Sequence, residues 1–339
     1  MTDETGDYDR FNAEHNHRFA QASDRLDPFF GEISDFLAAA CSPAIAEAIS
    51  SATICVEDGA NSYSASFVGA TTIRIGETFF DIVYAVSALI ESAKPQAPPA
   101  LTGPFAEHLH RLLTQLRNDS AQVGDFGPTG PLAEIGPLGP IDLRRAHYTL
   151  QYWMNVATGC ASVLPELSVD DNLLDRDRRL RPEYQIPADV KDRMDALAGV
   201  ARFFAVAHEY AHVLLGHTSA MTAIPEIAAQ AKAIIGSSGA LADQLDDVEL
   251  QADVIGLSMV MAFMRFHSPA TPGPVIAEDL LGPITVLGQT FDIAHNPDHL
   301  RQLGADATHP SARDREAILR HTANYLGTLS HPNLCYRSH

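Results

Sequence analysis

Basic residues are scarce in this chain of 339 residues, which has 23 Lys and Arg against 43 Asp and Glu and a formal net charge of −20. A surface with this excess of negative charge repels nucleic acids, so we expect no nucleic-acid partner. Cysteine is scarce as well: the four residues lie far apart in the sequence and form no C-x-x-C pair. Such cysteines are typical of reduced thiols in a cytoplasmic protein.

Long apolar runs are also missing. A membrane-crossing helix needs about 20 consecutive apolar residues, whereas the longest candidate, residues 254–266, is shorter and contains Arg265. The acidic first nine residues lack the apolar core of a secretory signal. We therefore expect no membrane insertion and a cytoplasmic location.

Composition divides the chain into four segments. Residues 1–26 are polar and charged and predict a flexible acidic arm. Residues 27–93 combine a helical period with short runs of β-branched and aromatic residues, which predict a helix and a small sheet. Residues 94–182 mix helical stretches with Gly/Pro-rich loops and predict an insertion suited to a regulatory partner. With the apolar helical patterns of residues 183–339, the predicted fold class is α+β, predominantly helical, with a small N-terminal sheet on a helical core.

The H-E-x-x-H sequence at residues 208–212 carries the strongest chemical signal. It lies in an apolar stretch without Pro or Gly, which favours a helix. Residues four apart share a helix face, so His208 and His212 can bind one metal ion, and Glu209 can reach a water molecule beside it. This is the arrangement of zinc peptidases, with two imidazole ligands and a general base. His217 would lie opposite His208, so we expect it to cap the helix or to support the site without binding the metal.

A catalytic zinc needs a third protein ligand and one open position. Glu249 and Asp253 begin a second apolar helix and share one of its faces, so one can bind the metal while the other orients a histidine ligand. The spacing does not decide between them. Asp246 and Asp247, just upstream, compete for the same role.

The two motifs together, H-E-Y-A-H at 208–212 and E-L-Q-A-D at 249–253, resemble the gluzincin pattern of HtpX-like and CAAX-prenyl-endopeptidase-like metallopeptidases. In that family the Glu of the second motif is the third zinc ligand and the Asp supports a ligand, which implies those roles for Glu249 and Asp253. Cytosolic Lit-type phage-exclusion peptidases also carry H-E-x-x-H. Typical HtpX-like members are embedded in membranes or exported, and their core does not need an insertion such as residues 95–180.

Two further segments are similar to the same family. The sequence T-H-P-S at 308–311, followed by Arg315, resembles its T-H-P-S segment and trailing Arg. Residues 61–64 and the T-I-R-I sequence at 72–75 resemble the edge strand that holds substrate. An exposed strand at the rim of the cleft would pair with an extended peptide. The resemblance therefore implies substrate contacts along Thr72, Ile73, Arg74 and Ile75.

His309 is a candidate for a second catalytic role. Pro310 suits the first turn of the last helix, so His309 would lie on the loop just before it. We expect His309 to donate a hydrogen bond to the transition state, or to fill the open metal position at rest, with Arg315 steadying the loop through an acid such as Asp253. The alternative is that His309 only caps the helix.

The predicted function is that of a zinc endopeptidase acting on an intracellular protein or peptide. One Zn²⁺ per chain would be bound by His208, His212 and Glu249, with Glu209 as the general base. Two other classes stay open: a zinc-stabilised module that binds a partner without catalysis, and a metal hydrolase of a small molecule. The intact Glu209 argues against the first, and a free edge strand would argue against the second.

Overall fold

The computed structural model describes residues 43–50, 52–57, 63–67, 70–98, 186–217, 223–294 and 310–329, together with residues 31, 33, 35, 36, 101, 102, 109, 110 and 113. The predicted arm at 1–26, most of the predicted insertion at 94–182, and His309 lie outside the described residues.

Helices dominate the described part of the chain, as predicted. They are α2 (Pro43–Ser50), α3 (Glu77–Ser92), α7 (Ala188–Leu214), α8 (Pro225–Ser237), α9 (Val248–His267), α10 (Gly273–Asp279), α11 (Leu281–Ala294) and α13 (Ala312–Thr328). None of the helices in the described ranges combines the length and the apolar character needed to span a bilayer.

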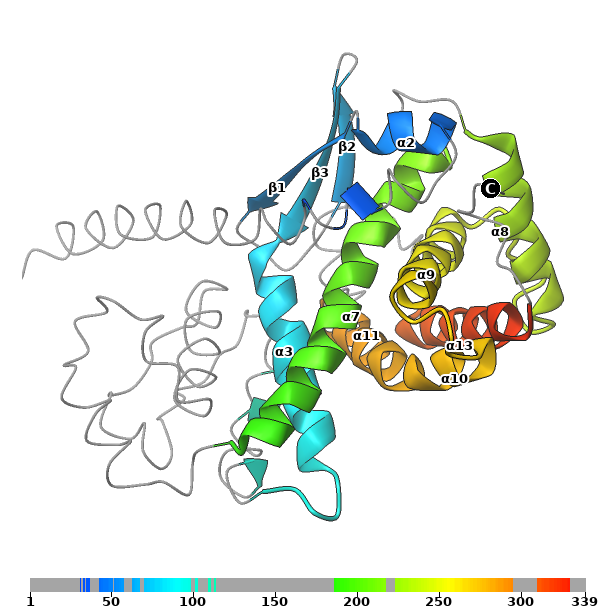
Figure 1. Cartoon of the computed structure of the whole chain (residues 1–339). Helices are drawn as coiled ribbons and strands as arrows, with labels where there is room; N and C mark the ends of the chain where they lie inside the picture. Colours follow the sequence, from blue (N-terminus) through cyan, green and yellow to red (C-terminus); the bar gives the residue numbers. More distant parts are fainter. Residues whose placement is uncertain are drawn as a thin grey trace, which may run out of the picture.

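Helix α7 is the longest described element, and it lies beside α3 (Figure 1). It begins after Pro187, whose φ of −56° suits a helix start, and Asp189 in the first turn complements the positive end of the helix dipole. Helices α3, α9 and α11 all pack against it. Its second half is therefore buried on almost every side, including the H-E-x-x-H segment.

Three strands form one mixed sheet. Strand β1 (Ala52–Glu57) pairs parallel with β3 (Ala70–Gly76), and β2 (Tyr63–Phe67) pairs antiparallel with the other side of β3. The order is therefore β1-β3-β2. Ile73 and Ile75 of β3 are fully buried, and α7 packs against β2 and β3 (Figure 1).

The expectation of an exposed edge strand is wrong for Thr72, Ile73, Arg74 and Ile75. These residues lie in β3, which has a partner strand on each side: Ile73 is opposite Ile54 of β1 and opposite Ser64 of β2. Strand order is set by pairing between segments, and the local run of β-branched residues carries no information about it. Strands β1 and β2 form the two edges of this sheet.

Helix α9 links α7 to the C-terminal helices. The side chain of Asp247 caps it by accepting hydrogen bonds from the backbone N–H groups of Glu249 and Leu250, each at 3.0 Å. All residues from 250 to 262 are buried, because α7, α8, α10 and α13 surround the helix. The site residues at its start are thus held on a rigid, enclosed element.

The last helix starts slightly later than predicted. Helix α13 begins at Ala312, and the hydroxyl of its N-cap residue Ser311 accepts a hydrogen bond from the Asp314 N–H at 3.1 Å. Pro310 therefore lies before the cap and not in the first helical turn. The helix begins after Ser311 because the serine hydroxyl accepts a hydrogen bond from a backbone N–H of the first turn, which a proline side chain cannot do.

Candidate metal centre

The two histidines of α7 point toward each other from one face of the helix. His208 Nε2 and His212 Nε2 are 3.1 Å apart, and both side chains are largely buried. Glu249, from the first turn of α9, approaches both rings: its Oε2 is 3.4 Å from His208 Nε2 and its Oε1 is 3.5 Å from His212 Nε2. These three residues form a group that could hold a metal ion.

The spacing of the three donors fits a tetrahedral metal. Zinc bonds to nitrogen and oxygen ligands are about 2.0–2.2 Å long, so two ligands of a tetrahedral ion lie roughly 3.3–3.5 Å apart. The two Nε2 atoms are 3.1 Å apart, and two different oxygens of Glu249 lie 3.4 Å from His208 Nε2 and 3.5 Å from His212 Nε2, which is close to that value. With one donor atom taken from each residue, the three atoms lie within 4.8 Å of one another. Two imidazoles and one carboxylate are also a donor set typical of catalytic zinc.

The other acids considered for the third ligand are engaged elsewhere. Asp247 caps α9 through its side chain. Asp246 forms an ion pair with Lys232, and its side chain is 89% exposed. Asp253 lies behind His208 rather than beside the donor group, with its Oδ1 3.0 Å from His208 Nδ1. This placement leaves Glu249 as the acid that faces both histidines.

A buried ion pair between Asp253 and Arg315 contacts the Nδ1 side of the His208 ring. Arg315 of α13 donates from Nε and Nη2 to the two carboxylate oxygens of Asp253, at 2.8 and 2.6 Å. The guanidinium also stacks on Phe291, 3.8 Å from the ring centroid. Asp253 is fully buried and Arg315 nearly so. The carboxylate of Asp253 therefore faces the side of the His208 ring opposite to the one that faces Glu249, which orients the ring.

The charges of this cluster need a cation. Burial raises the pKa of the Asp253 carboxyl, but the charge of Arg315 outweighs it and lowers that pKa. Burial likewise lowers the pKa of the Arg315 guanidinium, but the charges of Asp253, Glu249 and Glu209 raise it. Three carboxylates and one guanidinium leave two negative charges when both histidines are neutral. A divalent cation compensates them, which is the second respect in which the site fits a metal.

Without a metal, a proton compensates part of this charge. Burial lowers the pKa of His208, but its contacts with Asp253 and Glu249 outweigh burial and raise the pKa to about 9. Burial raises the pKa of Glu249, but its contacts with His208 and His212 lower it well below its usual range. The metal-free site at neutral pH therefore holds a His208 imidazolium facing a Glu249 carboxylate.

Metal binding should consequently be coupled to proton release. A metal binds the neutral imidazole, so zinc must displace the proton of His208 at pH 7. We expect about one proton released per zinc at pH 7, and an apparent affinity that rises about tenfold per pH unit until it levels off near pH 9. Calorimetric titrations in buffers of different ionisation enthalpy measure this proton count.

The stability of the metal-free protein should fall as pH rises, whereas its zinc affinity should increase. A folded pKa of about 9 for His208, above its usual value of 6.5, contributes stability that is complete below pH 6.5 and is lost as pH rises through 9. The loss is of the order of 3 kcal/mol. Denaturant titrations of metal-free protein between pH 6 and 9 test this, and a flat profile together with no proton release would contradict the assignment.

One residue that the sequence reasoning missed sets the distance between the ligand helices. Gly256 of α9 lies against α7 so closely that a Cβ atom there would be 3.0 Å from both Cα and N of His208. Both neighbours are backbone atoms of a buried helix and cannot move aside cheaply. The available signal was a glycine inside an otherwise apolar helical stretch, which usually has a packing reason.

Substituting this glycine should therefore weaken the centre. We expect Gly256→Ala to lower the free energy of unfolding by about 1–3 kcal/mol. It should also reduce zinc affinity, because the added methyl group would push α9, and Glu249 with it, away from the histidines of α7. Gly199→Ala is the matched control, since nothing lies within 4 Å of a Cβ at that position of α7. Alanine is the better helix former, so the control should be neutral or slightly stabilising. Equal behaviour of the two variants would rule out a role for the close approach.

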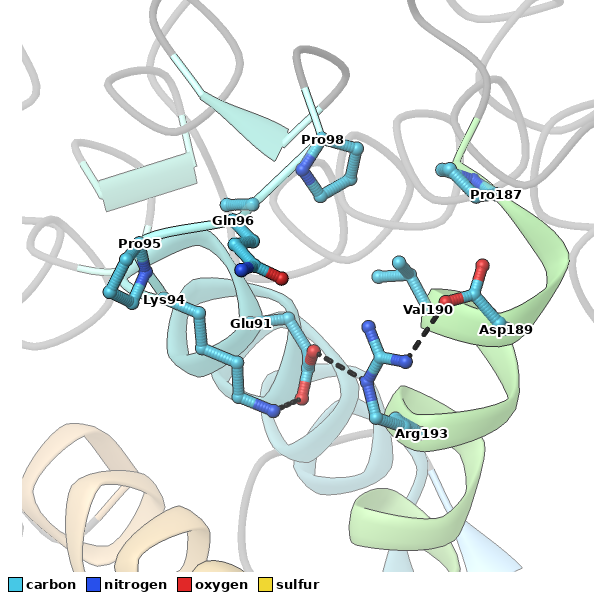
Figure 2. Close-up of a pocket in the computed structure, with 10 residues that line it drawn as sticks. Glu91, Lys94, Pro95, Gln96, Pro98, Pro187, Asp189, Val190 and Arg193 are labelled. Atoms are coloured by element: carbon cyan, nitrogen blue, oxygen red, sulfur yellow. Dashed lines mark hydrogen bonds and ion pairs between the residues drawn. The ribbon is translucent and has the colours of Figure 1, made fainter.

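A cavity lies at the start of α7, away from the histidines, and has different chemistry (Figure 2). It has a volume of about 590 Å³, and prolines form part of its wall. Arg193 donates to the buried Glu91 of α3 at 3.1 Å and to Asp189 at 3.0 Å, while Lys94 also pairs with Glu91. Two acids and two bases thus neutralise one another, and no histidine, cysteine or serine lines the cavity. We interpret these contacts as a structural link between α3 and α7, roughly 22 Å along the helix from His208.

Comparisons with protein-family profiles, with curated proteins and with solved structures gave no match to this chain. What the described residues establish is a predominantly helical protein with a buried His208, His212 and Glu249 group that could hold a metal ion.

Proposed function

We propose that this protein is a zinc-dependent endopeptidase of the gluzincin type. One observation carries the proposal: Glu209 lies next to His208 on α7, and the two histidines converge with Glu249 at distances that suit tetrahedral zinc. A purely structural zinc site has no use for a buried acid at this position. Glu209 is only 3% exposed, and its charge acts on Arg315 in the same cluster.

The proposed chemistry divides the residues by task. His208, His212 and Glu249 hold the ion, and Asp253 with Arg315 orients the His208 ring. Zinc supplies Lewis acidity when bound, which acidifies water and polarises a carbonyl group. Glu209 accepts a proton from the attacking water at its carboxylate, and the hydroxyl adds to the carbonyl carbon. Glu209 then delivers that proton to the leaving nitrogen as the C–N bond breaks.

The corrected strand order changes where a peptide substrate is proposed to bind. An extended peptide needs a strand with an open edge, and β3 has none. We place the peptide on β2, because α7, which carries both histidines, packs against this strand. The donor for the transition-state oxyanion is still proposed to be His309, on the ground of its T-H-P-S context alone.

The proposal is tested by hydrolysis that depends on the metal. Protein reconstituted with zinc is incubated with a peptide library of mixed sequence, and new amino termini are identified by mass spectrometry. We expect cleavage that stops on addition of a chelator and returns with zinc. Zinc bound at full occupancy without cleavage of any peptide would contradict the peptidase and favour the partner-binding module. Hydrolysis of small amides alone would favour the small-molecule hydrolase.

A further inference from the structure

His217 lies just beyond α7, with its ring against the ligand His212. The chain turns at Gly216, where φ is +69° and where a Cβ atom would lie 2.5 Å from the backbone nitrogen of Ala223. Glycine is the residue that tolerates both the positive φ and this approach. The backbone N–H of His217 then donates to the carbonyl oxygen of His212 at 3.0 Å. This tight turn folds the His217 ring back onto the site.

The two rings meet through their Nδ1 atoms, which are 2.9 Å apart. His212 Nε2 is the atom that faces His208 and Glu249. The contact with His217 is therefore on the side of the His212 ring away from the donor group. His217 is for this reason not a further ligand of the same ion, although it is only five residues from His212.

The His217 ring is supported in turn by α9. The side chain of Gln251 interacts with the His217 ring, and the Gln251 amide nitrogen donates to the carbonyl oxygen of Leu245 at 2.7 Å. A neutral imidazole has one nitrogen that donates and one that accepts.

Hydrogen-bond chemistry assigns the direction of this contact. A neutral imidazole that binds a metal through Nε2 carries its proton on Nδ1, and that proton needs an acceptor. The nearest acceptor for His212 is Nδ1 of His217. His217 must then carry its own proton on Nε2, and the amide oxygen of Gln251, whose side chain hydrogen-bonds the His217 ring, is the acceptor expected for it. Gln251 is anchored by its other end on Leu245.

We propose that His217 is a positioning residue that accepts the Nδ1 proton of His212 and so fixes the tautomer in which His212 Nε2 is free to bind the metal. This inference rests on the metal site proposed above. It also makes the two histidine ligands unequal. His208 is backed by the carboxylate of Asp253, whereas His212 is backed by a neutral ring, which makes it the less basic ligand.

Tautomers are measured directly by nitrogen NMR of the histidine rings in zinc-loaded protein. We expect His217 to be neutral with its proton on Nε2, and His212 to carry its proton on Nδ1. A His217 that is cationic, or that is protonated on Nδ1, would overturn the proposal. This readout does not depend on any catalytic activity.

Two substitutions separate positioning from a structural role. His217→Leu removes the acceptor, and we expect zinc affinity to fall about 10- to 100-fold with a changed visible spectrum of the cobalt-substituted protein. His217→Gln offers an amide oxygen in its place and should restore most of the affinity. His321→Leu is the matched control, because the His321 ring contacts Ser237 on the surface and not the centre.

The outcomes also distinguish this inference from the metal site itself. If His217→Leu lowers the stability of the metal-free protein but leaves zinc affinity and the cobalt spectrum unchanged, His217 is structural and the proposal fails. If instead His212→Ala still binds zinc with native affinity, the proposed metal site is wrong, and the proposal fails with it. Loss of zinc affinity in both His212→Ala and His217→Leu, with recovery in His217→Gln, supports both.

Discussion

Replacing Glu209 with glutamine is expected to lower peptide hydrolysis by about 10²–10⁴-fold while the protein keeps its full zinc content. Glutamine has nearly the same shape as glutamate but cannot accept the proton of the attacking water. The metal contacts come from His208, His212 and Glu249, so the substitution leaves the donor group intact. Elemental analysis and a peptide assay on the same preparation measure the two effects together.

The same variant controls for contaminating proteases. Activity that copurifies with the Glu209→Gln protein at the native level would come from another enzyme or from a different mechanism, and either result removes Glu209 as the general base. A variant that loses activity and zinc together would be uninformative about proton transfer. It would instead show that the acid is needed to build the site, which contradicts the division of tasks proposed here.

The second large effect concerns Glu249 and Asp253, the two acids of α9. Substituting Glu249 should cost more zinc affinity, and substituting Asp253 should cost more stability of the metal-free protein. Glu249→Ala removes a donor that lies 3.4 and 3.5 Å from the two imidazole nitrogens. It should reduce zinc affinity by more than the roughly 10- to 100-fold expected for a residue that only orients a ligand. Asp253→Asn should fall within that smaller range, because Asp253 contacts His208 Nδ1 from behind.

The free energy of unfolding of the metal-free proteins should show the reverse order. Asp253→Asn leaves the buried Arg315 guanidinium without its counter-charge, and breaking a buried pair in this way costs about 3–5 kcal/mol. Glu249 lies 3.9 Å from Arg315 and is partly exposed, so Glu249→Ala should cost less. Zinc titrations of both variants measure the affinities, and denaturant titrations measure the free energies of unfolding, so the two expected orders can be compared. If Asp253→Asn lost more zinc affinity than Glu249→Ala, the roles of the two acids would have to be exchanged.

The parts of the site that sequence predicted are those fixed by local geometry. Helical spacing places His208 and His212 on one face whatever surrounds the helix, and the apolar stretches of α7 and α9 predicted both helices. The expected contact of Arg315 with Asp253 is present in the structure, while His309, whose loop Arg315 was expected to steady, lies outside the described residues. Spacing alone left Asp246 and Asp247 open beside Glu249, because all three acids lie near the start of one helix. The motif resemblance implied Glu249, and the fold brings its carboxylate to both histidines.

The parts that sequence missed depend on contacts between distant segments. The central position of β3 results from pairing with β1 on one side and β2 on the other, and the composition of residues 71–75 suits a central strand as well as an edge strand. The close approach at Gly256 depends on how α9 crosses α7. The tight turn at Gly216 that directs His217 depends on the later segment at Ala223. None of these relations leaves a periodic pattern in the sequence.

The crossing of α7 and α9 at Gly256 has a consequence for how the protein opens. The donor group spans both helices, so a bound ion acts as a cross-link between segments that are more than thirty residues apart in sequence. Amides at the end of α7 and at the start of α9 should then share one opening free energy when metal is bound. Chelation should speed hydrogen exchange at both places together, while α3, which is linked to α7 through Glu91 and Arg193, keeps its protection.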